Sequence, residues 1–321
     1  MERDIQHLFT KKISIKGNFI EFVDDINEET ASNQDQTKEI FSAKWEDVSK
    51  YENFNTAIDF QNNWFLELYG FENETDLKEY LKDKSTIIDT GCGLGYKAAL
   101  FAKLAPNAVV LGIDISDAVI IASEKYKNID NLYFLKRDIA NTGLKKNVID
   151  FTVCDQVIMH TEVPEHTFCH LSEITSPGGE FACYVYSKKA LPRELVDDYF
   201  RKATHEIPND KMWEFSAQLT ELGKQLSELN VSFDCPDIPV LGIKGGNYDV
   251  QRFIYWNFLK CFWKDDWGFD LSKSTNYDWY APSNAKRFSK QEFMDMVNEN
   301  NLRVTYLHEE EACYSGRFLK A

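Results

Sequence analysis

The chain has 321 residues, of which 43% are hydrophobic and 27% charged, as in ordinary soluble globular proteins. Its formal net charge of −16 argues against a nucleic-acid partner, because such binding depends on neutralising phosphates with Lys and Arg. The seven cysteines form no C-x-x-C pair, which favours free thiols in a reducing compartment. Because no segment has the character of a signal peptide or a membrane span, we expect a cytoplasmic protein without a membrane partner.

The first 85 residues predict two segments that precede the main domain. Residues 1–39 contain an alternating stretch from Ile13 to Phe22, typical of a small hairpin, followed by a polar connection from Asp24 to Glu39. Residues 40–85 carry apolar and aromatic side chains at roughly helical spacing, without proline, and predict two or three helices. We expect these helices to form an N-terminal lid.

From residue 86 the pattern changes to strands that alternate with helices. The expected strands are 86–89, 109–113, 132–135, 150–158 and 180–186, and the expected helices include 96–104, 117–126, with Ser116 as N-cap, and 164–174. Such alternation predicts an α/β fold with a doubly wound, mostly parallel sheet over residues 86–187. Residues 188–288 then predict a helical, unusually aromatic insertion, and residues 289–321 a helix and a closing strand pair of the core.

A glycine cluster follows the first of these strands. The run Asp89-Thr90-Gly91-Cys92-Gly93-Leu94-Gly95-Tyr96 leads from a strand into a helix, where glycines allow close approach of a ligand and the helix N-terminus offers free N–H groups. A dinucleotide fingerprint requires G-x-G-x-x-G, and here the third glycine comes one residue early. An acid two residues before Gly91 suits a cofactor amino group better than a pyrophosphate. These features favour S-adenosylmethionine (SAM).

This segment resembles the first motif of the class I, Rossmann-like SAM-dependent methyltransferases, acid-x-Gly-x-Gly-x-Gly, and the following strand ends agree in order. The resemblance implies the seven-stranded sheet of that family and SAM as cofactor. It also implies contacts from Asp89 to the cofactor ammonium, from Gly91 and Gly93 to the methionine moiety, from Asp114 to the ribose and from Asp138 to the adenine. The full set of cofactor-binding residues predicted in this way is Asp89, Gly91, Cys92, Gly93, Asp114, Ile115, Asp138, Ile139, Asp155, Gln156 and Trp45.

His160 follows the fourth expected strand, where the family closes its active site. An imidazole can take a proton from a hydroxyl nucleophile, so His160 is the candidate catalytic base, although alignment alone can drive methyl transfer and many such histidines only position substrate. Trp45 is expected either to close over the cofactor or to pack in the core. His166 and His170 lie one helical turn apart, but without a third ligand they predict no metal.

Aromatic side chains are dense in the insertion and are interleaved with a few polar groups, as in small-ligand pockets. We expect this insertion to be a substrate cap, and the alternatives are a hydrophobic core or a homodimer face. Asn276 to Pro282 also resembles a stretch in a poorly characterised subgroup of these methyltransferases with an aromatic C-terminal insertion. The predicted substrate-binding residues are Tyr186, Tyr248, Arg252, Trp256, Tyr277, Trp279 and Tyr280.

Three functions follow from this sequence. The first is a SAM-dependent methyltransferase that acts on a small molecule, at an oxygen of a sugar-like or other polyhydroxy metabolite. The second keeps the reaction but has an amine or a thiol as acceptor, for which aromatic rings could surround a cation. The third is a non-catalytic protein that binds SAM or serves as a scaffold.

Overall fold

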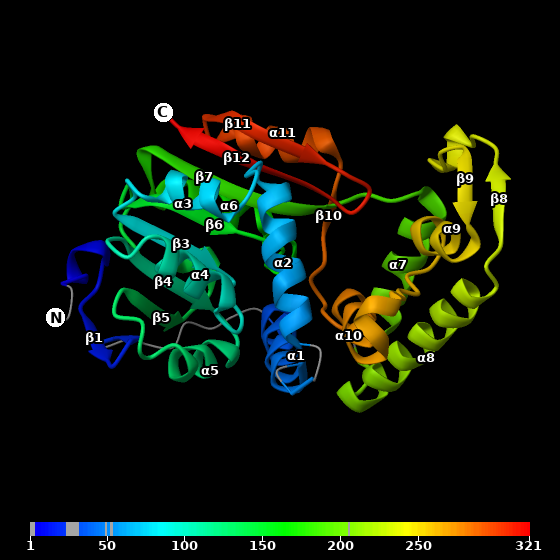
Figure 1. The fold of residues 1–321 in the computed structure, drawn as a ribbon, viewed down its shortest axis with the longest axis horizontal. Helices are drawn as coiled ribbons and strands as arrows, with labels where there is room; N and C mark the ends of the chain where they lie inside the picture. The colour runs from blue at the N-terminus through cyan, green and yellow to red at the C-terminus, as the bar shows by residue number, and fades with distance from the viewer. Residues whose placement is uncertain (1–3, 24–31, 49, 52–53, 205) are drawn as a thin grey trace. The chain divides into compact units, whose positions relative to one another are not determined.

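The computed structural model describes residues 4–23, 32–48, 50–51, 54–204 and 206–321, which belong to two compact units (Figure 1). The first unit comprises Met1–Trp45, Ile58–Ser187 and Lys286–Ala321, and the second comprises Glu46–Ala57 and Lys188–Ala285. The insertion therefore ends three residues earlier than predicted. Residues 46–57, which were predicted as part of the N-terminal lid, belong to the second unit.

The first unit holds the sheet and the helices that cover it. Its strands are β1 (Ile13–Lys16), β2 (Phe19–Phe22), β3 (Thr86–Thr90), β4 (Val109–Asp114), β5 (Leu132–Lys136), β6 (Ile149–Cys154), β7 (Thr175–Ser187), β10 (Arg287–Phe288), β11 (Leu302–Glu309) and β12 (Cys313–Lys320). Its helices are most of α1 (Ser32–Val48) and of α2 (Phe54–Leu68), together with α3 (Glu74–Leu81), α4 (Tyr96–Leu104), α5 (Ala118–Lys125), α6 (Pro164–Ile174) and α11 (Lys290–Glu299).

Seven of these strands form the predicted doubly wound core, so the fold class is confirmed. They lie in the order β5-β4-β3-β6-β7-β12-β11, and the neighbours from β5 to β7 are parallel whereas β12 is antiparallel to β7 and to β11. The hairpin β1–β2 continues the sheet beyond this core, because β2 pairs with β5 in parallel. The short strand β10 pairs with β7.

Aromatic side chains cover both faces of the sheet. Successive strand residues point to opposite faces of the sheet, so Glu180 and Phe181 of β7 contact helices on opposite faces. Glu180 accepts a hydrogen bond of 2.8 Å from the hydroxyl of Tyr80 in α3. The ring of Phe181 contacts that of Phe168 in α6, with centroids 4.8 Å apart. Helix α3 therefore lies on one face and helix α6 on the other, as a doubly wound sheet requires.

The boundaries of several elements differ from the prediction. Helix α1 begins at Ser32, within the segment predicted as a polar connection, and residues 24–31 of that segment lie outside the described part of the chain. Strand β6 ends at Cys154 rather than at residue 158, and a 3-10 turn, η3 (Ile158–His160), follows. The predicted N-cap Ser116 is wrong, because Asp117 holds that position and the Ser116 hydroxyl donates to Asp114 instead.

The second unit is mainly helical. It contains α7 (Leu191–Thr204), α8 (Asn209–Glu228), α9 (Val250–Asn257), α10 (Gly268–Tyr280) and a small antiparallel pair, β8 (Ser232–Cys235) with β9 (Gly246–Asp249). Its core depends on ring packing between helices, since the rings of Trp213 in α8 and Tyr277 in α10 stack at 3.8 Å. Within the described residues of the chain, no helix is long and apolar enough to cross a membrane.

Candidate functional site

The glycine turn after β3 has a backbone that only glycine adopts readily. Gly91, Gly93 and Gly95 have φ angles of +76°, +51° and +73°, in the left-handed region. A Cβ on Gly91 would overlap the side chain of Val157, and one on Gly93 would come within 3.0 Å of the Trp45 indole. The turn is thus closely covered on two sides, and helix α4 starts directly after it at Tyr96.

Asp89 is an almost fully buried carboxylate at the start of this turn, with 3% of its surface exposed. The backbone N–H of Ala98 donates to the carboxylate, but Oδ2 has no hydrogen-bond partner among the described residues. Burial raises the pKa of Asp89 from 3.8 to about 6, an effect that Lys97 opposes and that the carboxylates of Asp155 and Asp114 increase. A buried, unpaired carboxylate oxygen fits a cationic ligand group, such as the ammonium of a bound amino acid.

Asp114, at the end of β4, holds the glycine turn in place. Its Oδ2 accepts a hydrogen bond of 2.8 Å from Gly93 N, and its Oδ1 accepts from Ser116 N at 2.8 Å and from Ser116 Oγ at 2.6 Å. Burial raises the pKa of Asp114, and these three hydrogen bonds oppose the rise. A carboxylate has about four acceptor positions, so about one is left for a ligand hydroxyl.

Asp155, at the end of β6, has a partner that the sequence did not predict. Its side chain is 1% exposed and is paired with the ammonium of Lys97, which comes from the first turn of α4. The hydroxyl of Tyr69 also donates to Asp155, at 3.0 Å. Burial is the largest single influence and lowers the pKa of Lys97, but Asp155, Tyr96 and Asp89 together outweigh it and the net direction is upward. The position of Lys97 in the first turn of α4, among mostly apolar residues, was the signal of this pair in the sequence.

Gln156, the next residue, has a φ of +64° and turns its amide back across the same network. Its Nε2 donates to Gln61 Oε1 at 2.7 Å and more weakly to Asp155 at 3.3 Å. Both Asp155 and Gln156 therefore form hydrogen bonds with other protein side chains, and a cofactor contact from either of them stays a prediction.

The other predicted cofactor residues surround the same strand ends. Cys92 and Ile139 are buried, and Ile115 is half-buried directly after β4. Asp138 caps the 3-10 turn η2 (Ile139–Asn141), because its side chain accepts from Ala140 N at 2.9 Å. The ammonium of Lys44 lies 4.0 Å from the centroid of the Trp45 ring.

His160 lies in η3 within an aromatic environment and is 6% exposed. Its ring makes edge contacts with Phe41 at 5.0 Å and with Tyr186 at 5.6 Å between centroids. Its Nε2 is 3.4 Å from the hydroxyl of Tyr186, so these two predicted residues are brought together. Which of the two atoms donates depends on the tautomer of the imidazole.

The remaining predicted substrate residues belong to the second unit and differ in exposure. Tyr277, Trp279 and Tyr280 are almost fully buried, and their polar atoms bond within the unit: Tyr277 to Asn209, and Trp279 and Tyr280 to Asp197. These three side chains have hydrogen-bond partners within the core of the second unit. The half-buried predicted residues of this unit are Tyr248, Arg252 and Trp256. A substrate role for any of the six stays a prediction.

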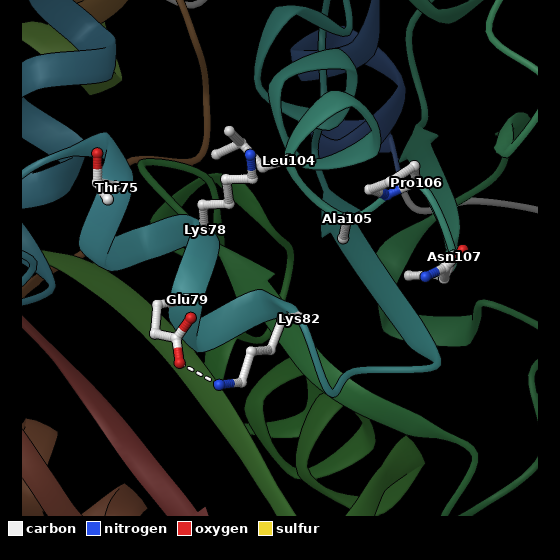
Figure 2. Close-up of a pocket in the computed structure, with 9 residues that line it drawn as sticks. Thr75, Lys78, Glu79, Lys82, Leu104, Ala105, Pro106 and Asn107 are labelled. Atoms are coloured by element: carbon white, nitrogen blue, oxygen red, sulfur yellow. Dashed lines mark hydrogen bonds and ion pairs between the residues drawn. The ribbon is translucent and has the colours of Figure 1, made fainter.

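A cavity of about 510 Å³ lies between α3 and the segment before β4, lined by Lys78, Lys82 and Ala105 among others (Figure 2). Glu79 and Lys82 form an ion pair at its edge. The segment 104–108 leads into the amino end of β4, whereas ligands of open α/β sheets bind at the carboxyl ends of the strands. This cavity is therefore not the cofactor site. In the described part of the chain, no group of three or more His, Cys, Asp or Glu side chains could hold a metal ion.

Comparison with known proteins agrees with this geometry. A family model described as a methyltransferase domain matches residues 81–251, just over half of the chain. The chain belongs to this methyltransferase family. The match includes the glycine turn and the acids at the ends of β3, β4 and β6, so the predicted class I SAM-dependent methyltransferase is confirmed at the level of family and cofactor.

Curated relatives of this methyltransferase match only in part. An uncharacterised methyltransferase of Schizosaccharomyces pombe is 28% identical over 41% of this chain and 52% of its own length. The mitochondrial ubiquinone biosynthesis O-methyltransferase of the same yeast is 24% identical over 55% of this chain and 61% of its own length. The chain thus spans between half and two thirds of these two relatives. Among solved structures, the magnesium protoporphyrin IX methyltransferase of Synechocystis PCC 6803 with bound SAM is 10% identical, with a TM-score of 0.47 over 92% of this chain and 100% of that one.

Proposed function

We propose that this methyltransferase transfers a methyl group from SAM to a small-molecule acceptor, at an oxygen of a polyhydroxy metabolite. The observation that carries the cofactor part of the proposal is Asp89, whose Oδ2 is buried without a hydrogen-bond partner in the described residues, beside a turn of left-handed glycines. A buried anion of this kind requires a cation to be stable, and the ammonium of the methionine moiety is that cation in SAM.

The residues at the other strand ends have complementary roles in this proposal. The backbone of Gly91 and Gly93 would approach the methionine moiety, because neither residue carries a Cβ. Asp114 would accept from a ribose hydroxyl at its remaining acceptor position, and Asp138 from the adenine amine. The bound cofactor supplies an activated methyl group on a sulfonium. Trp45, whose indole lies against Gly93, would exclude water from this part of the site.

His160 is proposed as the general base for the acceptor hydroxyl. A buried imidazole between Phe41 and Tyr186 is held in a fixed orientation, as a base must be if it is to reach the proton it removes. Tyr186 is a proposed acceptor contact and lies next to His160 Nε2. An acceptor hydroxyl placed near Tyr186 would therefore be within reach of the imidazole.

The acceptor class rests on charge and on one relative. The net charge of −16 disfavours a polyanionic acceptor such as RNA. The ubiquinone biosynthesis relative is, by its name, an O-methyltransferase of a small molecule, which supports oxygen as the accepting atom here. The aromatic second unit suits a small organic acceptor better than a protein surface.

The proposal is tested by incubating the purified chain with methyl-labelled SAM and a metabolite extract, and by identifying the labelled products by mass spectrometry. Label in a hydroxylated small molecule supports the proposal, whereas label only in protein or RNA refutes it. Tight binding of SAM, measured by calorimetry, without turnover of any acceptor would favour the non-catalytic alternative.

The base is tested with His160→Asn once an acceptor is known. We expect kcat to fall by about 10²- to 10⁴-fold with little change in the Kd for SAM. The matched control is His166→Asn, since His166 is exposed on α6, and it should leave kcat unchanged. A loss of less than about threefold in His160→Asn would remove the base from the mechanism, because general base catalysis is worth more than that.

A further inference from the structure

Among the described residues of the second unit, one buried ammonium group forms no salt bridge. Lys260 is 7% exposed, and its Nζ lies 4.5 Å from the centroid of the Trp279 ring. Within the described chain, no carboxylate forms a salt bridge with this ammonium. Lysine is almost never buried without a partner, so this position requires an explanation.

Two further cations lie over indole rings of the second unit, and one of them shares the ring of Trp279 with Lys260. The guanidinium of Arg193 is 5.1 Å from the centroid of the Trp279 ring, and the ammonium of Lys189 is 5.5 Å from that of Trp256. Arg193 and Lys189 both disfavour the charged form of Lys260 electrostatically, so each lies close enough to repel its ammonium. Three cations from two separate segments, next to two indole rings, form a defined cluster.

Two carboxylates, Asp278 and Asp197, act on Lys260 electrostatically, and Asp197 already has several donors. Its Oδ2 accepts from Arg193 Nε and from Trp279 Nε1, both at 2.8 Å, and its Oδ1 accepts from the hydroxyl of Tyr280 at 3.0 Å. That hydroxyl in turn accepts from the backbone N–H of Lys260 at 3.1 Å. Asp197 therefore fixes the framework around Lys260 without pairing its ammonium.

The pKa of Lys260 is lowered to about 7; burial is the largest cause, Arg193 and Lys189 act in the same direction, and Asp278 and Asp197 oppose them. An anion bound beside the ammonium would reverse this effect, because an opposite charge nearby favours the charged form. The framework is thus preorganised for negative charge, and the aromatic rings offer a surface for the organic part of a ligand.

We propose that Lys260, Arg193 and Lys189 form a binding site for the oxyanion group, carboxylate or phosphate, of a small organic ligand. The site lies entirely within the second unit and does not rest on the proposed methyl transfer. Lys260 and Lys189 would donate charge-assisted hydrogen bonds to the anion, while Arg193 stays fixed by Asp197 and by the carbonyl of Tyr255.

The site is tested on the full chain by thermal unfolding in inorganic phosphate, in acetate and in benzoate, each compared with chloride at equal ionic strength. A rise in Tm that saturates with phosphate, or with the carboxylates, supports the site and identifies which oxyanion it prefers. If chloride gives the same Tm as all three probes, the site does not exist.

The variant Lys260→Met removes the charge but keeps the length of the side chain. We expect the apparent Kd for the preferred anion to rise by about 10- to 100-fold, as for loss of a hydrogen bond to a charged group. The matched control is Lys224→Met, because Lys224 also lies over a ring, that of Trp263 at 5.6 Å, but is 41% exposed and lies 3.8 Å from Glu228. This control should leave the Kd unchanged.

A second variant, Lys189→Met, keeps the test valid should the first fail to fold, since Lys189 is only half-buried. Lys189→Met should also raise the apparent Kd for the preferred anion by about tenfold or more. Equal anion affinity in the wild type and in both variants overturns the proposal. Binding of SAM, measured in parallel, should be the same in all four proteins, and this separates the anion site from the cofactor site.

Discussion

The substitution Asp89→Asn should have opposite effects on stability and on cofactor binding. The asparagine keeps the shape of the side chain and removes its charge. Without cofactor, the pKa of Asp89 in the folded protein is about 6, compared with the ordinary value of 3.8 for an exposed aspartate, and burial is the main cause. For an acid with a raised folded pKa, the carboxylate destabilises the fold once it ionises. Stability should therefore fall as the pH rises from about 4 to about 6, and the full cost, about 3 kcal/mol, should be present at pH 7.

Asp89→Asn should consequently increase the free energy of unfolding of the cofactor-free protein at pH 7 by up to about 3 kcal/mol. It should also flatten the dependence of that free energy on pH between about 4 and 6. Urea denaturation at several pH values measures both effects. In contrast, loss of a charge-assisted hydrogen bond to the ammonium should weaken SAM binding by about 10- to 150-fold, corresponding to about 1.5–3 kcal/mol, and calorimetry measures this change.

The matched control is Asp117→Asn, three residues beyond Asp114, because the Asp117 side chain is 60% exposed and pairs with Lys136 on the surface. We expect it to change stability by less than about 0.5 kcal/mol and to leave the Kd for SAM unchanged. If Asp89→Asn binds SAM as tightly as the wild type and is no more stable than it at pH 7, the assignment of Asp89 to the ammonium is refuted.

Two further substitutions test the framework of the site. Gly91→Ala should lower the free energy of unfolding by about 1–3 kcal/mol and the affinity for SAM by at least about tenfold, since the added Cβ would overlap Val157. The control for backbone strain alone is Gly178→Ala, because Gly178 has a φ of +77° and open space around the added Cβ. Lys97→Met should cost about 3–5 kcal/mol in urea denaturation, because it leaves Asp155 buried without its cation. Adding Asp155→Asn should recover much of that loss, and additive effects of the two changes would contradict the ion pair.

The sequence was sufficient for the parts of this protein that depend on neighbouring residues. Strand periodicity, the spacing of three glycines and an acid at the end of each strand are local patterns, and the structure places Asp89 and Asp114 at one edge of the sheet as those patterns predict. This follows because parallel strands bring their carboxyl ends together whatever the loops between them. Ring density in residues 188–288 predicted an insertion, although not which of its rings would be buried.

Tertiary structure alone decided the partners of the buried charges. Lys97 meets Asp155 across 58 positions of sequence. The ammonium of Lys260 lies over the ring of Trp279, and Arg193 lies near the same ring because α7 and α10 pack together. It also decided that residues 46–57 join the second unit and that β2 extends the sheet at β5. The physical reason is that desolvation and Coulomb energy depend on distances between side chains from remote segments, and one-dimensional spacing does not contain those distances.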